Sequence, residues 1–181
     1  TGVELSYLSP HLEEGYPGNL LVKVTYLLNN SNELSIRYEA ETDQDTILNL
    51  TNHTYFNLTG CRENIFGHKL TINSSKQIES NNLIPTGKQV DASGTIFDFS
   101  KGKSIGQDIA ELTDGYDTGY ALETENRKPV VAAILSEETT GRMVEVLTNQ
   151  PSVHVYTGYY IPELKGHNDT SYGRYMGVAI E

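Results

Sequence analysis

The chain has 181 residues, enough for one sizeable core, and hydrophobic residues make up 37% of it. Its formal net charge of −11 would repel phosphate backbones and anionic lipid surfaces, which argues against nucleic-acid and membrane partners and suits a neutral ligand. The single cysteine, Cys61, excludes an intrachain disulfide and fits a reducing compartment. The sequence shows no signal peptide and no long apolar run, so we expect a cytoplasmic protein.

The first part of the sequence predicts strands. Leu20–Leu28 is an apolar, β-branched run, Asn29–Glu33 follows as a turn, and apolar residues then alternate with polar ones from Leu34 to Ala40. These features predict a β-hairpin. Ile47–Leu58 is expected to form a third extended segment.

The remaining elements are expected in this order: a strand at Lys69–Asn73, a tight turn at Leu83–Gly87, a loop from Ser93 to Gly119 with one helical turn within Ile105–Leu112, a hairpin of Val130–Ser136 and Arg142–Thr148, a strand at Val153–Ile161, and a last apolar run to Glu181. Many short strands with almost no helix predict an antiparallel β-sandwich or barrel. The sequence starts without Met and ends inside an apolar run, so we expect residues 1–181 to be a fragment of one longer domain.

Polar side chains concentrate in the segment Asn49–Leu58, where a strand would usually carry apolar ones. In an extended segment His53, Tyr55 and Asn57 would share one face. The other face would carry Asn52, Thr54, Phe56 and Leu58. One interpretation is a functional site built around the histidine, and the other is a histidine satisfied on a hydrated sheet face.

Two further features carry carboxylates. Asp114–Tyr120 is dense in Asp and Gly, which is typical of a turn. Glu181 ends the apolar run that begins at Met176, and a carboxylate at such a position could have a raised pKa and act as a base. It could equally open an exposed loop.

Other chemistries find little support in the sequence. His11, His68 and His167 lack a zinc-like spacing to cysteine or to each other. The chain has no Walker loop, dinucleotide-binding fingerprint or nucleophile elbow. Cys61 lies beside Arg62, and one basic neighbour is weak evidence for a nucleophile.

At the polar segment the sequence resembles a known family. Asn49–Gly60, which reads NLTNHTYFNLTG, closely resembles the central signature of aldose 1-epimerases. Further matching segments follow in the family's order and cover nearly the whole chain: Glu14–Leu20, Leu83–Gly87, Thr95–Phe99, Asp114–Asp117, Thr139–Arg142 and Tyr156–Gly158.

The resemblance implies a large antiparallel β-sandwich of the galactose-mutarotase-like type and an isomerase that interconverts the α and β anomers of free hexoses. His53 matches the family's general acid, which protonates the sugar ring oxygen, and Glu181 matches the general base, which takes the proton of the anomeric hydroxyl. The substrate-binding positions that the resemblance implies are Asp117, Tyr55, Thr54 and His154. The reaction is redox-neutral and moves no phosphoryl group, so neither a cofactor nor a metal is expected.

Some positions depart from the family pattern. Thr118 and Gly119 follow Asp117 where His-Asn is usual, His154 stands in place of a sugar-contacting Gln, and Tyr159 in place of an Asn. These departures affect which sugar hydroxyls the protein would recognise rather than the interconversion of anomers itself. The family's substrate-binding Arg and second His are expected in a segment that precedes this sequence.

Three other functions remain open at this point. The chain could be a non-catalytic carbohydrate-binding or structural β-sandwich, or the mutarotase domain of a bifunctional nucleotide-sugar 4-epimerase. A substrate such as a phosphorylated hexose would call for clustered basic residues, and thirteen Lys and Arg are dispersed among twenty-four acidic residues.

Overall fold

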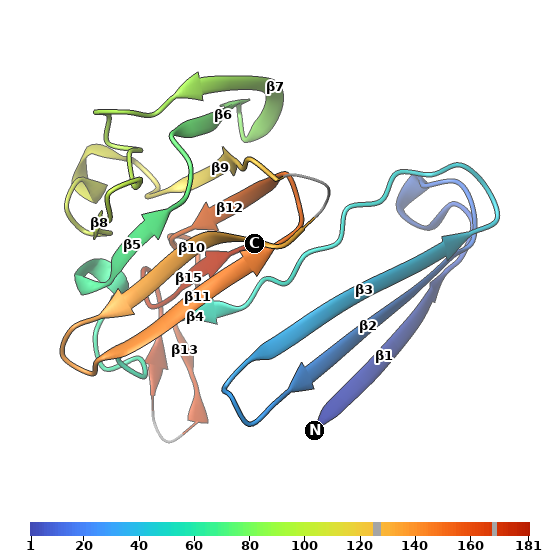
Figure 1. The fold of residues 1–181 in the computed structure, drawn as a ribbon, viewed down its shortest axis with the longest axis horizontal. Helices are drawn as coiled ribbons and strands as arrows, with labels where there is room; N and C mark the ends of the chain where they lie inside the picture. Colours follow the sequence, from blue (N-terminus) through green and yellow to red (C-terminus); the bar gives the residue numbers. More distant parts are fainter. Residues whose placement is uncertain (125–127, 168–169) are drawn as a thin grey trace. The chain divides into compact units, whose positions relative to one another are not determined.

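Antiparallel strands make up nearly all of the regular structure in the computed structural model, which describes residues 1–124, 128–167 and 170–181 (Figure 1). The described part contains three short 3₁₀ turns, at Glu13–Gly15, Ile65–Gly67 and Ile109–Glu111. No described helix is long and apolar enough to cross a membrane. The chain divides into two compact units, Thr1–Thr51 and Asn52–Glu181, which are described separately below.

The first unit is a three-stranded meander of β1 (Gly2–Ser9), β2 (Leu20–Leu28) and β3 (Leu34–Thr42). The hairpin predicted for Leu20–Ala40 is confirmed. Directly paired residues point to the same side of a sheet, so the row of Leu5, Val24 and Tyr38 marks one apolar face. Charged residues such as Lys23 and Glu39 alternate onto the other face.

The second unit contains two larger sheets and a two-stranded ribbon. The six-stranded sheet has, in spatial order, β4 (Tyr55–Phe56), β15 (Val178–Ile180), β12 (Ser152–Tyr156), β9 (Asp117–Ala121), β6 (Lys76–Asn81) and β7 (Ile84–Asp91). The four-stranded sheet has β11 (Arg142–Thr148), β10 (Val130–Glu137), β5 (Lys69–Ile72) and β8 (Lys103–Ser104). The ribbon pairs β13 (Leu164–Lys165) with β14 (Ser171–Tyr172).

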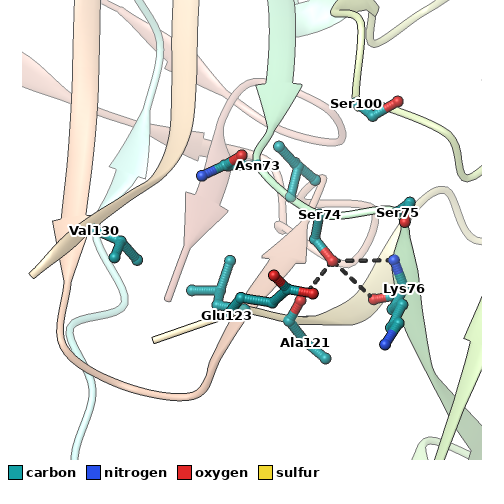
Figure 2. Close-up of a pocket in the computed structure, with 10 residues that line it drawn as sticks. Asn73, Ser74, Ser75, Lys76, Ser100, Ala121, Glu123 and Val130 are labelled. Carbon is teal, nitrogen blue, oxygen red and sulfur yellow. Dashed lines mark hydrogen bonds between the residues drawn. The ribbon is translucent and has the colours of Figure 1, made fainter. Parts of the chain in front are cut away.

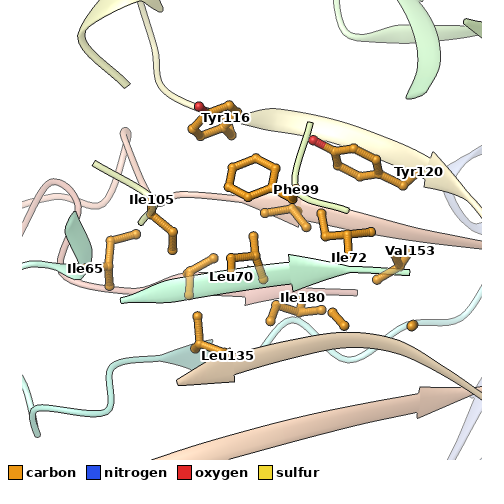
Figure 3. Packing of buried hydrophobic residues seen from close by; sticks show 14 of the residues in the cluster. Ile65, Leu70, Ile72, Phe99, Ile105, Tyr116, Tyr120, Leu135, Val153 and Ile180 are labelled. Atoms are coloured by element: carbon orange, nitrogen blue, oxygen red, sulfur yellow. The ribbon is translucent and has the colours of Figure 1, made fainter. Parts of the chain in front are cut away.

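Both larger sheets supply side chains to one buried cluster (Figure 3). Leu70 of β5 and Leu135 of β10 are fully buried, and Val153 of β12 is 1% exposed. Tyr116 and Phe99 pack edge to face, with ring centroids 5.0 Å apart. The core therefore lies between two antiparallel sheets, and the predicted all-β sandwich is confirmed.

The segment predicted as a long third strand is mostly irregular. Within Ile47–Leu58 the structure forms strand pairing at Tyr55–Phe56 alone. The carboxamide oxygen of Asn52 accepts hydrogen bonds from the backbone N–H and the hydroxyl of Thr54. Such local side-chain bonds compete with a strand ladder, so the prediction of a continuous strand was wrong.

The tight turn predicted at Leu83–Gly87 was also misplaced. The chain reverses direction at Asn82 and Leu83, at the start of the predicted segment, and the φ values of these residues are +49° and +65°. Strand β7 begins at Ile84 and contains Pro85, which pairs with Ser80. Pro85 is tolerated because β7 is an edge strand of its sheet. Proline lacks a backbone N–H, and at an edge this does not interrupt the hydrogen bonds between inner strands.

Two more predictions need correction. The loop expected over Ser93–Gly119 contains β8, and β9 begins within it at Asp117; its single helical turn is present as the 3₁₀ turn Ile109–Glu111. The strand expected over Val153–Ile161 ends at Tyr156. It stops near Gly158, which has φ +69°, a conformation that favours glycine and cannot continue a strand.

Candidate active site

One face of the six-stranded sheet packs into the core, and the opposite face carries several polar side chains. Tyr55, Ala179, Tyr156 and Asp117 lie opposite one another on β4, β15, β12 and β9. Because paired residues share a face, this row and the residues two positions away form one surface. The residues between them, such as Val155, are buried in the core.

His53 and Glu181 meet on this polar face. The His53 Nε2 atom lies 3.1 Å from Glu181 Oε1, and the two side chains are 48% and 14% exposed. His53 lies two residues before the first residue of β4, and Glu181 is the residue that follows β15. The two strands pair with each other, which brings residues 128 positions apart in sequence into contact.

A second histidine–carboxylate pair lies on the same face. His154 Nε2 is 2.6 Å from Asp117 Oδ1. The backbones of His154 and Glu181 exchange two hydrogen bonds of 2.7 and 2.8 Å, so β12 continues to pair beyond the end of β15. Four of the residues predicted from the sequence, His53, Glu181, Asp117 and His154, are thus brought together.

Two tyrosine rings border these pairs. The ring of Tyr55 lies 4.8 Å from that of His53, and the ring of Tyr156 lies 6.2 Å from both. Burial raises the pKa of the Tyr55 hydroxyl, and the nearby Tyr156, Glu181 and Asp117 raise it further. Tyr55 was predicted. Tyr156 was not, although it alternates with His154 along β12 and could have been found from that spacing.

Hydrogen bonds fix the hydroxyl of Tyr156 and join two of the sequence motifs. The Tyr156 hydroxyl accepts from the backbone N–H of Tyr160 at 2.7 Å, and the Tyr160 hydroxyl donates to Asp114 Oδ2 at 2.7 Å. The hydroxyl of Thr157 accepts from the backbone N–H of Tyr116 at 2.9 Å. The residues Asp114–Tyr116, whose composition is typical of a turn, therefore lead into β9 through fixed hydrogen bonds, and Asp117 is the first residue of that strand.

Asn57 connects the segment that carries His53 to the one that carries Glu181. Its carboxamide donates to the carbonyls of Glu63 at 2.8 Å and Met176 at 2.9 Å. Its oxygen accepts from the backbone and the hydroxyl of Thr59. These bonds hold together the two segments that carry the catalytic candidates, and the shared face of Asn57 and His53 stays a prediction.

Leu58 anchors the same segment from the other side. Its carbonyl accepts from Arg142 Nη1 at 2.8 Å and from the Thr140 hydroxyl at 3.2 Å. Its backbone N–H donates to His68 Nε2 at 2.8 Å. His68 is fully buried, and in the described part of the chain its Nδ1 has no hydrogen-bond partner. Burial lowers the pKa of His68, so it accepts from Leu58 as a neutral imidazole.

This histidine makes stability depend on pH. Its pKa is lower in the folded protein than the ordinary value of 6.5, so below about pH 6.5 the unfolded chain binds more protons than the folded one. The free energy of unfolding should therefore fall as the pH falls, by up to about 1.4 kcal/mol per pH unit until the folded-state pKa is reached. Above about pH 6.5 this contribution is fully present.

Urea unfolding at about pH 7.5 and about pH 5.5 checks this expectation. The variant His68→Gln can still accept from Leu58 but does not titrate, so it should lose less stability on acidification than the unsubstituted protein. His167→Gln, at an exposed histidine, is the matched control. An equal loss in His68→Gln and in the unsubstituted protein would contradict the role given to His68.

A separate surface hollow of 410 Å³ lies elsewhere on this unit (Figure 2). Asn73, Ser74, Lys76 and Glu123 are among its lining residues, and it includes none of the predicted site residues. The Ser74 hydroxyl donates to the carbonyl of Ala121 at 2.5 Å and accepts from the N–H of Lys76 at 3.0 Å. These hydrogen bonds connect the start of β6 to the end of β9, so the role of Ser74 here is structural.

The remaining sequence candidates are placed as follows. The Thr54 hydroxyl bonds to Asn52 at 2.5 Å, and its part in sugar binding stays a prediction. Burial raises the pKa of the Cys61 thiol, which disfavours a nucleophilic thiolate. Within the described ranges, no group of three or more His, Cys, Asp and Glu residues is arranged to hold a metal ion.

Known proteins are similar to this chain in sequence and in fold. The family model described as aldose 1-epimerase matches residues 1–181. A human protein named galactose mutarotase is 39% identical over 99% of this chain and 53% of its own length. An aldose 1-epimerase of Haemophilus influenzae is 36% identical over 93% of this chain and 51% of its own length.

Solved structures of similar fold carry related names. A galactose 1-epimerase from Lactobacillus acidophilus superposes with a TM-score of 0.83 at 31% identity, covering 98% of this chain and 52% of that one. An aldose epimerase homologue from C. elegans gives a TM-score of 0.86 at 28% identity, covering 99% and 55%. The chain spans about half the length of the relatives it matches. On the match of the family model to its full length, the chain belongs to the aldose 1-epimerase family.

Proposed function

We propose that the full-length product of the gene encoding this chain is an aldose 1-epimerase, an isomerase that interconverts the α and β anomers of free aldohexoses such as galactose and glucose. One observation carries the proposal: an imidazole and a carboxylate, His53 and Glu181, lie 3.1 Å apart, and the side chain of His53 is 48% exposed. Ring opening of a hemiacetal needs one proton given and one removed, and this pair can do both.

The reaction follows from these roles. Protonated His53 gives its proton to the ring oxygen while the Glu181 carboxylate takes the proton of the anomeric hydroxyl, and the bond from the anomeric carbon to the ring oxygen breaks. The open aldehyde then rotates about its bond to the second carbon. Closure on the other carbonyl face returns one proton to His53 and one to the new anomeric oxygen. Both groups end in their starting states, so no further reactant is consumed.

The surrounding groups suit a neutral, hydroxyl-rich ligand. Asp117 can accept hydrogen bonds from sugar hydroxyls, and the tyrosine rings of Tyr55 and Tyr156 can pack against the C–H faces of a sugar. His154 and Thr54 are proposed as further substrate contacts. The names of two relatives, galactose mutarotase and galactose 1-epimerase, support galactose as a substrate. The charge of −11 supports an uncharged sugar over a phosphorylated one or a nucleic acid. The single cysteine supports a cytoplasmic location.

Polarimetry of freshly dissolved α-D-galactose tests this function with the full-length gene product. Optical rotation should relax with first-order kinetics at a rate proportional to protein concentration and well above the rate in buffer. Relaxation no faster than in buffer would contradict the proposal and favour a non-catalytic carbohydrate-binding or structural β-sandwich. Assaying a nucleotide-sugar 4-epimerase activity in the same sample shows whether the mutarotase domain is part of a bifunctional enzyme.

A further inference from the structure

The strand that leads on from the proposed general acid is very short. In the described part of the chain, β4 has two residues and lies at the outer end of the six-stranded sheet, where it pairs with β15. Strand β15 lies between β4 and β12, and Glu181 exchanges two backbone hydrogen bonds with His154. Glu181 is therefore held in place from β12, whereas the position of His53 depends on how the segment around β4 is held against β15.

The register between β4 and β15 brings the acid and the base together. Phe56 lies opposite Val178, and the same antiparallel register, extended beyond the ladder, sets His53 opposite Glu181. The distance of 3.1 Å between their side chains agrees with this register. Because side chains alternate between the two faces of a strand, a slip by one residue would turn the His53 ring away from the carboxylate. A register defined by two residue pairs needs further support.

The side chain of Asn57 provides such support. Asn57 directly follows β4, and its Nδ2 atom donates to the carbonyl of Met176, two residues before β15, at 2.9 Å and to that of Glu63 at 2.8 Å. Its oxygen accepts from the backbone N–H of Thr59 at 3.0 Å and from the Thr59 hydroxyl at 2.6 Å. A carboxamide has two N–H donors and an oxygen that accepts two hydrogen bonds, so all of its capacity is used and its orientation is fixed.

Close backbone contact restricts the same register. Gly177 lies opposite Asn57 in the extended register, and a Cβ atom on Gly177 would lie 2.8 Å from the Cβ atom of Tyr55. The Cβ atom of Tyr55 cannot rotate away, so only glycine lets the two segments lie this close. A slip by one residue would bring Met176 or Val178 to this point, where their side chains would not fit.

We propose that Asn57 is a positioning residue that keeps His53 in register with Glu181 and thereby sets kcat for mutarotation, without contact to the sugar. The inference rests on the proposed function, in which His53 is the general acid. The candidate substrate contacts Asp117 and His154 belong to β9 and β12, which pair with each other through their own backbone ladder. The affinity for the sugar should therefore depend little on Asn57.

The variant Asn57→Ser tests this role in the full-length gene product. The serine hydroxyl can still accept from the N–H of Thr59 two residues further on, but it is too short to reach Met176. We expect kcat for galactose mutarotation to fall about 10–100-fold, as for a misplaced catalytic group, while KM stays within about twofold. Asn64→Ser is the matched control, because Asn64 accepts from the N–H of Phe66 two residues on and serine can keep that bond. Both kinetic parameters should be unchanged in it.

A second substitution separates positioning from a general loss of structure. If Asn57 acts through His53, adding Asn57→Ser to His53→Ala should not lower the residual rate further. A loss by the same factor in both backgrounds would contradict the inference. The backbone bond from Ile65 N–H to the carbonyl of Tyr175, at 2.9 Å, joins the same two segments independently of Asn57, so the fold should persist. Should Asn57→Ser unfold below the assay temperature, Asn57→Asp replaces it in both backgrounds, because it keeps the size of the side chain and the bonds to Thr59.

Hydrogen–deuterium exchange of the same proteins separates this inference from the proposed function, because exchange needs no turnover. In Asn57→Ser the peptide that contains β4 should exchange about tenfold faster than in the unsubstituted protein, which matches the loss of about one hydrogen bond, and β12 should exchange as before. Faster exchange at β4 in a protein that does not accelerate mutarotation would overturn the proposed function and leave the structural role of Asn57 standing. Unchanged exchange at β4, or an unchanged kcat in a protein that does catalyse mutarotation, would overturn the inference.

Discussion

Replacing Glu181 with glutamine is expected to lower kcat for galactose mutarotation by about 10²–10⁴-fold, the range that a single general acid or base contributes. Glutamine has nearly the same shape as glutamate but cannot take a proton. The backbone hydrogen bonds that Glu181 shares with His154 do not depend on its side chain, so the sheet should form as before. The loss should appear in kcat more than in KM, because the base acts in the transition state.

Polarimetric progress curves over a range of galactose concentrations measure this effect. Glu138→Gln is the matched control, since Glu138 is an exposed glutamate in the turn between β10 and β11. It makes the same chemical change outside the site and should leave the rate unchanged. A Glu181→Gln protein with the unsubstituted kcat would mean that another group removes the anomeric proton.

Replacing His53 with alanine is expected to cause a loss of similar size, about 10²–10⁴-fold in kcat, because the ring oxygen would depart without a proton. The side chain of His53 is 48% exposed, so a small molecule can reach the space that alanine leaves. Added imidazole should therefore restore part of the mutarotase rate of His53→Ala, with a dependence on the imidazolium concentration. This rescue is a sign of proton transfer that loss of packing would not produce.

Two controls make the His53 experiment decisive. His167→Ala removes an exposed histidine and should neither lose activity nor respond to imidazole beyond the effect of buffer catalysis. The urea midpoint of His53→Ala should stay near that of the unsubstituted protein, because Asn57 and Leu58 anchor the segment independently of the His53 ring. A slow variant with no rescue and a much lower midpoint would indicate a structural role for His53.

Much of the strand content followed from hydrophobic periodicity. The hairpins Leu20–Ala40 and Val130–Thr148 were predicted because apolar alternation and turn residues agree there. Ile47–Leu58 was misassigned because the Asn52 side chain accepts a hydrogen bond from the backbone N–H of Thr54, a local bond that periodicity does not register. The turn at Leu83–Gly87 was misplaced because Pro85 is compatible with an edge strand, and only tertiary structure reveals which strand is at the edge.

The candidate site was predicted from the resemblance to a family rather than from local sequence patterns. His53, Asp117 and Glu181 are far apart in sequence, and their proximity depends on the order β4-β15-β12-β9, which local patterns do not specify. The pairing of His154 with Asp117 could not have been predicted either, because it requires the cross-strand register of β12 and β9. Tyr156 could have been recognised by its alternation with His154 once β12 was accepted as a strand.

The mutarotation rate of D-galactose shows whether His53 and Glu181 act on the same sugar when four full-length proteins are assayed side by side: the unsubstituted protein, His53→Ala, Glu181→Gln and the double variant. Groups that act as one unit are strongly non-additive, so the double variant should be about as slow as the slower single variant. That result would show that His53 and Glu181 serve the same proton transfers across one sugar. A single variant with the unsubstituted rate, or losses that multiply in the double variant, would contradict a shared role of His53 and Glu181 in catalysis.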